Sequence, residues 1–403
     1  MRWYVLPLLL LLLVGCSHQP KPGLYPAGTD AVLPDLVDDG GYAGLAEAIR
    51  RSLEYYGRLP DDRSFTYGEW TYTAREMEAS MRHFLFLQQT LSEDELEQRL
   101  RADFHIFESR NEEGRAFFTG YYEPVLSGRL QPEEEAFASP LYAMPEDLIE
   151  ADLGAFSDEL EGRTLRGKLS GKRLIPYDDR SEIVYQNSLD QRAQPLAYLE
   201  NDIEVFFLQI QGSGLVQLDN GTLLRLNYAG QNGHSYFAIG RLLLDKIPRE
   251  QMSLQSIKQY LYEHPDEVES ILATNPSYTF FRLVEEGPLG NIEVPLTPER
   301  SIAMDRRVIP KGGLVWLETT YPAAAFPEEN KPRPLRRFGV VQDTGGAIRG
   351  HGRADIFWGN GERAERIAGP MKQAGRLFLL VARKEVLESA PPGDDSLEGV
   401  SLR

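Results

Sequence analysis

Two aspartates that flank a glycine-rich segment are the residues best suited to chemistry in this sequence. Asp343 ends one apolar run, and Asp355, twelve positions later, begins another. Cleavage of a glycosidic bond needs an acid that keeps its proton near neutral pH, which a carboxyl group does when it is desolvated or lies beside another negative charge. A hydrolase adds a second carboxylate roughly 5–9 Å from the first. A strand, a turn and a returning strand would bring both aspartates to one cleft wall. The pattern also fits a turn aspartate that binds its own backbone.

A third aspartate, Asp305, follows another short apolar run upstream. With four further motifs, the three aspartates resemble the membrane-bound lytic murein transglycosylase A (MltA) family, which carries a three-aspartate (3D) domain. The motifs occur in the family's order and span roughly residues 45 to 385; they are Thr119-Gly120-Tyr121-Tyr122-Glu123-Pro124, Leu208-Gln209-Ile210-Gln211-Gly212-Ser213-Gly214, Tyr228-Ala229-Gly230-Gln231-Asn232-Gly233-His234 and Asn275-Pro276-Ser277-Tyr278.

The resemblance implies a mainly β fold with helices (α+β). A double-psi β-barrel domain, formed by residues 41–126 and 283–387, would be split in sequence by a smaller β-rich domain at residues 127–282. N-terminal helices would belong to the first unit. A groove between the two domains would hold a glycan strand of peptidoglycan.

The resemblance also implies a peptidoglycan lytic exotransglycosylase, a carbon–oxygen lyase. The 6-hydroxyl of N-acetylmuramic acid would attack its own anomeric carbon, so that one carboxyl group could act in turn as acid and as base. Asp355 matches the family's catalytic aspartate, and Asp343 and Asp305 match the two that would support it. Two alternatives stay open: a two-aspartate glycoside hydrolase, and a murein-binding lipoprotein without catalytic activity.

A sugar-binding groove needs aromatic faces for the rings and polar groups for the hydroxyl and N-acetyl edges. Arg349 is a candidate for a substrate carboxylate, with a surface salt bridge as the alternative. Core or strand packing is the alternative for the aromatic and polar candidates. The predicted substrate-binding residues are Thr119, Tyr121, Tyr122, Gln209, Gln211, Ser213, Gly346, Arg349 and Trp358.

The N-terminus predicts export and lipid attachment. Arg2 and the apolar run of residues 5–14 form a signal peptide over residues 1–15, too short to span a bilayer comfortably. The run ends in Leu13-Val14-Gly15-Cys16, which matches a lipobox, and Cys16 is the only cysteine of the chain. Since Ser17 rather than aspartate follows, we expect an outer-membrane lipoprotein facing the periplasm. Residues 16–40 would be a tether and residues 388–403 a disordered tail.

The composition excludes several classes of function. The formal net charge of −18 disfavours binding to a nucleic-acid backbone, which needs clustered Lys and Arg. The six histidines show no paired metal-ligand spacing, and no phosphate-binding glycine loop is present, so we expect neither a metal nor any other cofactor. The expected partners are glycan strands, the outer membrane through Cys16 and, in a larger complex, cell-wall synthetic enzymes.

Local patterns predict the elements that position these residues. Capping-box sequences at Thr73 and Ser92 predict two helices, and a helix-like spacing precedes them at residues 39–56. Residues 116–124 and 205–214 are predicted strands. Helices are expected again at residues 234–244, 253–262 and 266–273, and short strands over residues 292–382.

Overall fold

The computed structural model describes residues 21, 23–27, 33–133, 136–249, 251–329 and 331–389. The predicted signal peptide, Cys16 and residues 390–403 of the predicted tail lie outside them. Within these ranges no helix is long and apolar enough to cross a membrane.

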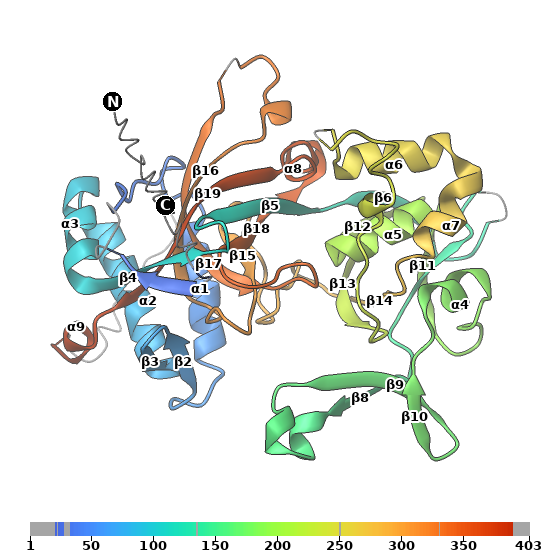
Figure 1. Cartoon of the computed structure of the whole chain (residues 1–403), viewed down its shortest axis with the longest axis horizontal. Coiled ribbons are helices and arrows are strands. Elements are labelled where there is room, and N and C mark those ends of the chain that lie inside the picture. The colour runs from blue at the N-terminus through green and yellow to red at the C-terminus, as the bar shows by residue number, and fades with distance from the viewer. Residues whose placement is uncertain are drawn as a thin grey trace, which may run out of the picture.

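The largest sheet has eight strands, and six of them form a closed ring of pairings (Figure 1). The strand order is β1-β4-β19-β16-β17-β15-β18-β5, and β5 also pairs with β19. Their bounds are β1 Gly23–Pro26, β4 Phe104–Arg110, β5 Ala116–Glu123, β15 Ser301–Met304, β16 Leu314–Thr320, β17 Pro334–Asp343, β18 Arg353–Asn360 and β19 Lys372–Ala382. Because β5 comes from the N-terminal part and β15–β19 from the C-terminal part, segments far apart in sequence build one sheet.

Helices at the N-terminal end cover this sheet (Figure 1). They are α1 Leu45–Tyr56, α2 Ala74–Thr90 and α3 Glu93–Asp103, with the hairpin of β2 Ser64–Tyr67 and β3 Trp70–Thr73 before α2. At the start of α2 the Thr73 hydroxyl accepts from Glu76 N at 3.2 Å, and Glu76 Oε2 accepts from Thr73 N at 2.7 Å. The helices predicted from the two capping boxes and from residues 39–56 are therefore confirmed.

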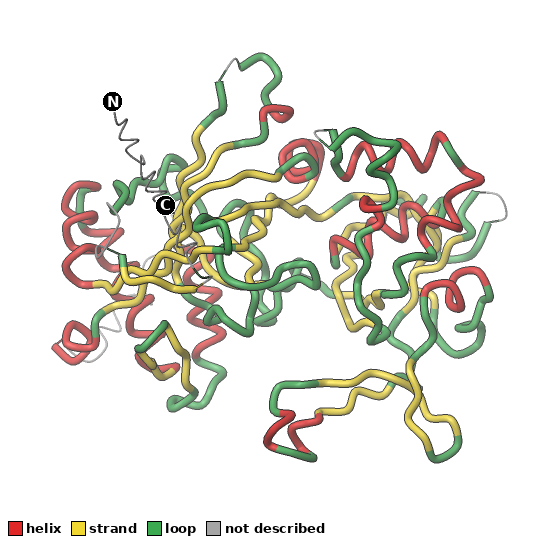
Figure 2. Tube along the Cα trace, in the orientation of Figure 1, coloured by secondary structure: helices red, strands yellow, loops and turns green. Residues whose placement is uncertain are grey.

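A second group of elements lies between β5 and β15 in sequence and forms its own cores. Its six-stranded sheet has the order β14-β13-β12-β6-β11-β7, and a three-stranded sheet, β10-β9-β8, stands apart from it as an arm (Figure 2). The strands are β6 Val125–Arg129, β7 Ser139–Tyr142, β8 Ile149–Asp152, β9 Thr164–Ser170, β10 Arg173–Pro176, β11 Pro195–Leu199, β12 Ser213–Leu218, β13 Leu223–Gln231 and β14 Thr279–Leu283. The helices are α4 Arg180–Tyr185, α5 Asp202–Gln211, α6 Leu254–Glu263 and α7 Val268–Leu272.

A buried ion pair joins the two groups at the point where β5 continues into β6. Glu123, which is 0% exposed at the end of β5, binds Arg225 of β13, with its two carboxylate oxygens 2.7 and 2.8 Å from Nη1. Burial raises the pKa of Glu123 although Arg225 opposes the shift. The chain as a whole is mainly β with helices, which confirms the predicted fold class at that level.

Four local predictions were wrong. Residues 205–214 are not one strand: they form most of α5 and the start of β12, because the Asn201 side chain caps the backbone of Ile203 and Glu204 and Gly212 ends the helix at φ 80°. Periodicity alone cannot separate a short buried strand from a buried helix. Residues 234–244 contain only the 3-10 turn Ile239–Arg241. Residues 292–382 also hold a helix, α8 Gly361–Ala368.

The predicted tether is the fourth correction. Gly23–Pro26 pairs with β4, and Leu36 and Asp38 are buried. Asp38 forms a buried ion pair with Arg300, which holds the described residues around Asp38 against the fold. At the other end, the helix α9 Lys384–Ser389 enters the predicted tail by two residues.

Candidate active site

Three site residues and one small residue lie in register across four neighbouring strands. Thr119 of β5 is paired with Asp355 of β18, Asp355 with Ala303 of β15, and Ala303 with Asp343 of β17. Paired residues direct their side chains to the same face of a sheet. Two strand spacings separate the backbones of the two aspartates by about 9–10 Å. Ala303 between them is buried and ends at its methyl group, so the residue paired with both aspartates places no larger side chain between them.

Asp343 is held by three donors. Tyr121 Oη donates to Oδ2 at 2.8 Å, and the backbone N–H groups of Asn291 and Thr344 donate to Oδ1 at 3.0 and 2.8 Å. Burial raises the pKa of Asp343 to about 6, against the lowering effect of these donors, and the charge of Asp355 adds to the rise. Both oxygens of Asp343 are thus occupied, and its proton is exchanged in the range where many enzymes work.

Asp355 has a less complete set of partners. Thr119 Oγ1 donates to Oδ1 at 2.7 Å and accepts from Arg353 Nη2 at 2.8 Å. Burial raises the pKa of Asp355, while the positive charge of Arg353 and the Thr119 hydrogen bond lower it. No donor from the described residues binds Oδ2. One carboxylate oxygen therefore remains available for proton exchange with a bound molecule.

Asp305 lies outside this row, beyond the end of β15. Its carboxylate is 0% exposed and accepts from Arg307 Nη2 at 2.6 Å, Arg307 Nε at 2.9 Å and Gly350 N at 2.8 Å. Burial alone would raise its pKa, but the hydrogen bonds from Arg307 and Gly350 lower it to about 2. Asp305 is consequently ionised and holds the loop that joins Asp343 to Asp355.

Four of the predicted substrate-binding residues lie around the aspartates. Thr119 and Tyr121 contact Asp355 and Asp343 directly. Gly346 and Arg349 are exposed on the loop between β17 and β18, and no atom lies within 4 Å of the position that a Cβ of Gly346 would take. Arg349 donates only to carbonyls of its own loop, at 3.4 Å, and no ion pair of the described chain includes it. The predicted alternative of a surface salt bridge is therefore not found there.

The remaining five lie in packed surroundings. Trp358 and Tyr122 are 2% and 6% exposed, and the Trp358 ring packs 5.5 Å from that of Tyr321. Gln209 and Ser213 are also buried, and Gln211 accepts from Tyr122 N at 3.2 Å. Successive side chains of a strand point to opposite faces, so Tyr122 faces away from Asp343. Gln209 donates instead to Thr279 O of β14 at 3.3 Å, and within the described chain none of the five hydrogen-bonds to Asp343 or Asp355.

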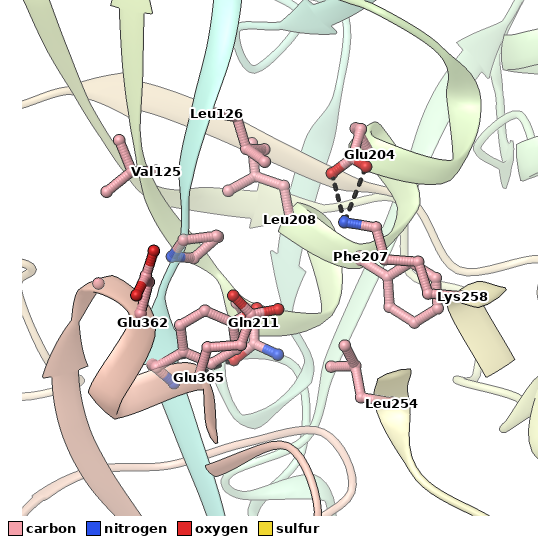
Figure 3. A pocket seen from close by; sticks show the side chains of 13 residues that line it. Val125, Leu126, Glu204, Phe207, Leu208, Gln211, Leu254, Lys258, Glu362 and Glu365 are labelled. Atoms are coloured by element: carbon pink, nitrogen blue, oxygen red, sulfur yellow. Dashed lines mark hydrogen bonds and ion pairs between the residues drawn. The ribbon is translucent and has the colours of Figure 1, made fainter. Parts of the chain in front are cut away.

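A pocket of ≈ 220 Å³ lies on that opposite side of β5 (Figure 3). Gln211, Glu365 of α8 and the ion pair of Glu204 with Lys258 line it. Neither Asp343 nor Asp355 is among its lining residues. This pocket is therefore separate from the carboxylate row.

The described residues contain no group of three or more His, Cys, Asp or Glu side chains that could hold a metal ion. Proton transfer through Asp355, beside the fixed carboxylate of Asp343, is the chemistry that the row itself supports.

Similarity to known proteins agrees with this arrangement. Residues 117–282 match the MltA specific insert domain and residues 300–381 match the 3D domain. The membrane-bound lytic murein transglycosylase A of Escherichia coli K12 is 33% identical over 399 residues, which cover 94% of this chain and 95% of that protein. The chain belongs to the MltA family.

Solved structures of family members have the same fold. The membrane-bound lytic murein transglycosylase of Agrobacterium tumefaciens superposes with a TM-score of 0.74 at 27% identity, over 91% of this chain and 99% of that one. Escherichia coli MltA, solved with bound chitohexaose, gives a TM-score of 0.66 at 26% identity, over 90% and 95% of the two chains.

The sequence prediction missed two groups of the site. Arg353 is two residues before Asp355, so in a strand both side chains share one face. That alternation was a usable signal for Arg353. The Asn291 backbone N–H, in contrast, reaches Asp343 from a loop that no local pattern links to it.

Proposed function

We propose that this chain is a lytic transglycosylase that cleaves the β-1,4 bond between N-acetylmuramic acid and N-acetylglucosamine in peptidoglycan. The observation that carries the proposal is the environment of Asp355. Its carboxyl is desolvated, has a raised pKa and keeps one oxygen free, and through Ala303 it is in register with a second carboxylate, that of Asp343. Family membership supplies the substrate class, since the relatives are named murein transglycosylases.

In the proposed reaction Asp355 starts as the acid. Its proton passes to the glycosidic oxygen while the bond from that oxygen to the anomeric carbon of the muramic residue breaks. The resulting carboxylate takes the proton of the 6-hydroxyl of the same sugar, whose oxygen then bonds to the anomeric carbon. A 1,6-anhydro ring forms, no water is consumed, and Asp355 is protonated again for the next cycle.

Asp343 is assigned a supporting role. Its oxygens are both engaged by Tyr121, Asn291 and Thr344, so it is poorly placed to exchange a proton with substrate. Above pH 6 its charge would stabilise the positive charge that develops at the anomeric carbon. Asp305 would act further away, by fixing the loop between the two other aspartates.

Substrate contacts are proposed for the residues that stay accessible around the row: Thr119, Tyr121, Gly346 and Arg349. The Tyr121 ring packs 5.2 Å from that of Phe357, which holds it beside the carboxylates. A six-sugar ligand bound to the Escherichia coli relative supports a groove for an extended glycan.

We further infer that the ring of β5, β15–β19 is the double-psi β-barrel of the split domain, with residues 127–282 as the inserted domain. The closed pairing of β5 with β19 and the separate cores of the two groups support this division. Anchoring to the outer membrane through Cys16, in the periplasm, is proposed from the lipobox and from the membrane-bound names of the relatives. Cell-wall synthetic enzymes remain proposed partners on the resemblance alone.

A two-aspartate hydrolase is the second candidate, favoured by the pKa of Asp343 near 6, which would suit a base that activates water. Digestion of purified sacculi followed by mass spectrometry separates the two reactions. A transglycosylase leaves 1,6-anhydromuramic ends, which are one water lighter than the reducing ends that a hydrolase leaves. Reducing ends alone would overturn the proposal, and intact sacculi would favour a binding protein.

A further inference from the structure

A second pocket, of ≈ 520 Å³, combines an apolar part of its lining with four basic side chains. The basic side chains come from two places: Arg63 next to β2, and the turn after β15 that carries Arg306, Arg307 and Lys311. Ser64, Thr66 and His351 add further polar groups, and no carboxylate is among the lining residues. In a chain with a net charge of −18, such a concentration of positive charge needs an explanation.

Most of this charge has no counter-ion in the fold. Among the ion pairs of the described residues, Arg307 binds Asp305, but none includes Arg63, Arg306 or Lys311. Burial lowers the pKa of Lys311, and the nearby charges of Arg306 and Arg63 lower it further. The cations therefore repel one another across the pocket, and a bound anion would relieve that repulsion.

His351 gives an independent sign of an absent ligand. Its Nδ1 is buried and has no hydrogen-bond partner. A buried polar atom without a partner destabilises the folded state. His351 also lines the pocket, beside the cations.

The pocket adjoins the carboxylate row. Arg306 follows Ala303 by three residues, so at most about 10 Å of extended chain separates them. Asp305 ties Arg307 to Gly350, and His351 is the next residue of the loop that leads to Asp355. Arg306 also lies near enough to Tyr228 of β13 to oppose the rise that burial gives the pKa of Tyr228.

We propose that this pocket binds the free carboxylates of the peptide stems that peptidoglycan carries, and so distinguishes peptide-bearing from peptide-free glycan strands. This inference rests on the proposed function. In peptide-bearing strands the lactyl carboxyl of each muramic residue is amidated, so the free carboxylates belong to the peptide, whose chain spans about 3.3–3.6 Å per residue. An amidase removes the carboxylates of the stem and leaves only the lactyl carboxylate on the sugar itself. A stem joined to the sugar at the aspartates can therefore reach Arg306 and Lys311 within a few residues.

The test compares two forms of one substrate. Glycan strands with intact stems, and the same strands stripped by an amidase, are digested by the full-length protein and by Arg306→Gln/Lys311→Gln. Lys246→Gln/Arg249→Gln is the matched control, since it removes two exposed cations from the loop before α6. On peptide-bearing strands the kcat/KM of the pocket variant should fall about tenfold, because KM rises while kcat stays unchanged. This is the size expected for the loss of two partly exposed charge pairs. On stripped strands it should equal the wild type, and the control should match the wild type on both.

Other outcomes are distinguishable. Equal loss on both substrates, or no loss on either, overturns the assignment of the pocket while leaving the proposed activity intact. If the wild type cleaves neither substrate, the proposed function itself fails. A further measurement tests binding of the protein to vesicles that contain anionic phospholipid. If the wild type binds them and the pocket variant does not, while both cleave peptide-bearing strands at the same rate, the pocket binds lipid phosphate and the proposal is overturned.

Discussion

Asp343 and Asp355 are in register with the same residue, Ala303, one on each side of β15. The two carboxylates therefore lie two strand spacings apart on a single sheet instead of at the ends of one hairpin. Their environments differ: three donors hold Asp343, whereas Asp355 keeps one free oxygen. Asp343 is therefore a charge that is fixed in place, whereas Asp355 is a group that can pass a proton.

Asp355→Asn should abolish most turnover without unfolding the chain. The amide keeps the shape and can still accept from Thr119, but it cannot give a proton to the leaving oxygen. General acid–base groups contribute about 10²–10⁴-fold, and here one group performs both steps, so the loss should reach the upper end. Release of soluble fragments from sacculi measures it, with the exposed Asp245→Asn as control. Near-normal turnover by the folded variant would move the assignment to Asp343.

Asp343→Asn should make the protein more stable at pH 7.5 but not at pH 3.5. The folded-state pKa of about 6 lies above the usual 3.8, so the native state binds the extra proton and loses stability as pH rises between these values. An asparagine stays neutral at both ends of this window. The expected gain is roughly 1–3 kcal/mol at pH 7.5, reduced by any solvent that reaches the group. Thermal melts at the two pH values test it, and a loss of stability at pH 7.5 would contradict the raised pKa.

Local patterns were enough for the elements that carry local signals. The capping boxes at Thr73 and Ser92 mark their helices because the bonds involved join residues three apart. The apolar runs beside Asp343 and Asp355 likewise predicted β17 and β18. The catalytic assignment itself came from resemblance, and it stays a prediction until the variants are assayed.

The features that the sequence did not predict depend on packing between segments that lie far apart in the chain. No pattern near Asp343 or Asp355 indicates that β15 inserts between their strands. The burial of Trp358 was equally beyond local sequence, since it depends on packing against α8 and Tyr321. An aromatic residue in a strand motif can serve a ligand or the core, and only the neighbouring elements decide which.

Thr119→Val should raise the pKa of Asp355 and shift the alkaline limb of its pH–rate profile upward. The Thr119 hydroxyl lowers this pKa by donating to the carboxylate, and it also holds Arg353. Loss of one such bond should move the limb by about one pH unit or less. Thr119→Ser, which keeps the hydroxyl, is the control. If valine and serine give the same profile, the hydrogen bond does not tune Asp355.

Asp305→Asn should destabilise the protein at pH 7 in a way that fades in acid. The carboxylate has a pKa near 2, below the usual 3.8, so its stabilisation is complete above about pH 4 and disappears as pH falls through 2. The cost at pH 7 should be about 1–3 kcal/mol. Arg307→Gln should cost more, because it leaves a buried charge without its ion-pair partner. Melting curves from pH 2 to pH 7 compare the two variants, and a difference for Asp305→Asn that is independent of pH would rule out this account.

Gly120→Ala should destabilise the chain, whereas Gly346→Ala should not. A Cβ on Gly120 would lie 2.6 Å from Trp358 Nε1 and 2.9 Å from the Cα of Ala368, so β18 or α8 would have to move. Overpacking of this kind costs roughly 1–3 kcal/mol. At Gly346 the added methyl meets nothing within 4 Å, and the change should stay within about 0.5 kcal/mol.

Because Gly120 lies between Thr119 and Tyr121, a shift of β5 would also displace the groups that hold both aspartates, so turnover by Gly120→Ala should fall even at temperatures where it is folded. Thermal melts and sacculus digestion on the two variants check both statements. Full activity in a destabilised Gly120→Ala would mean that the carboxylate row tolerates movement of β5.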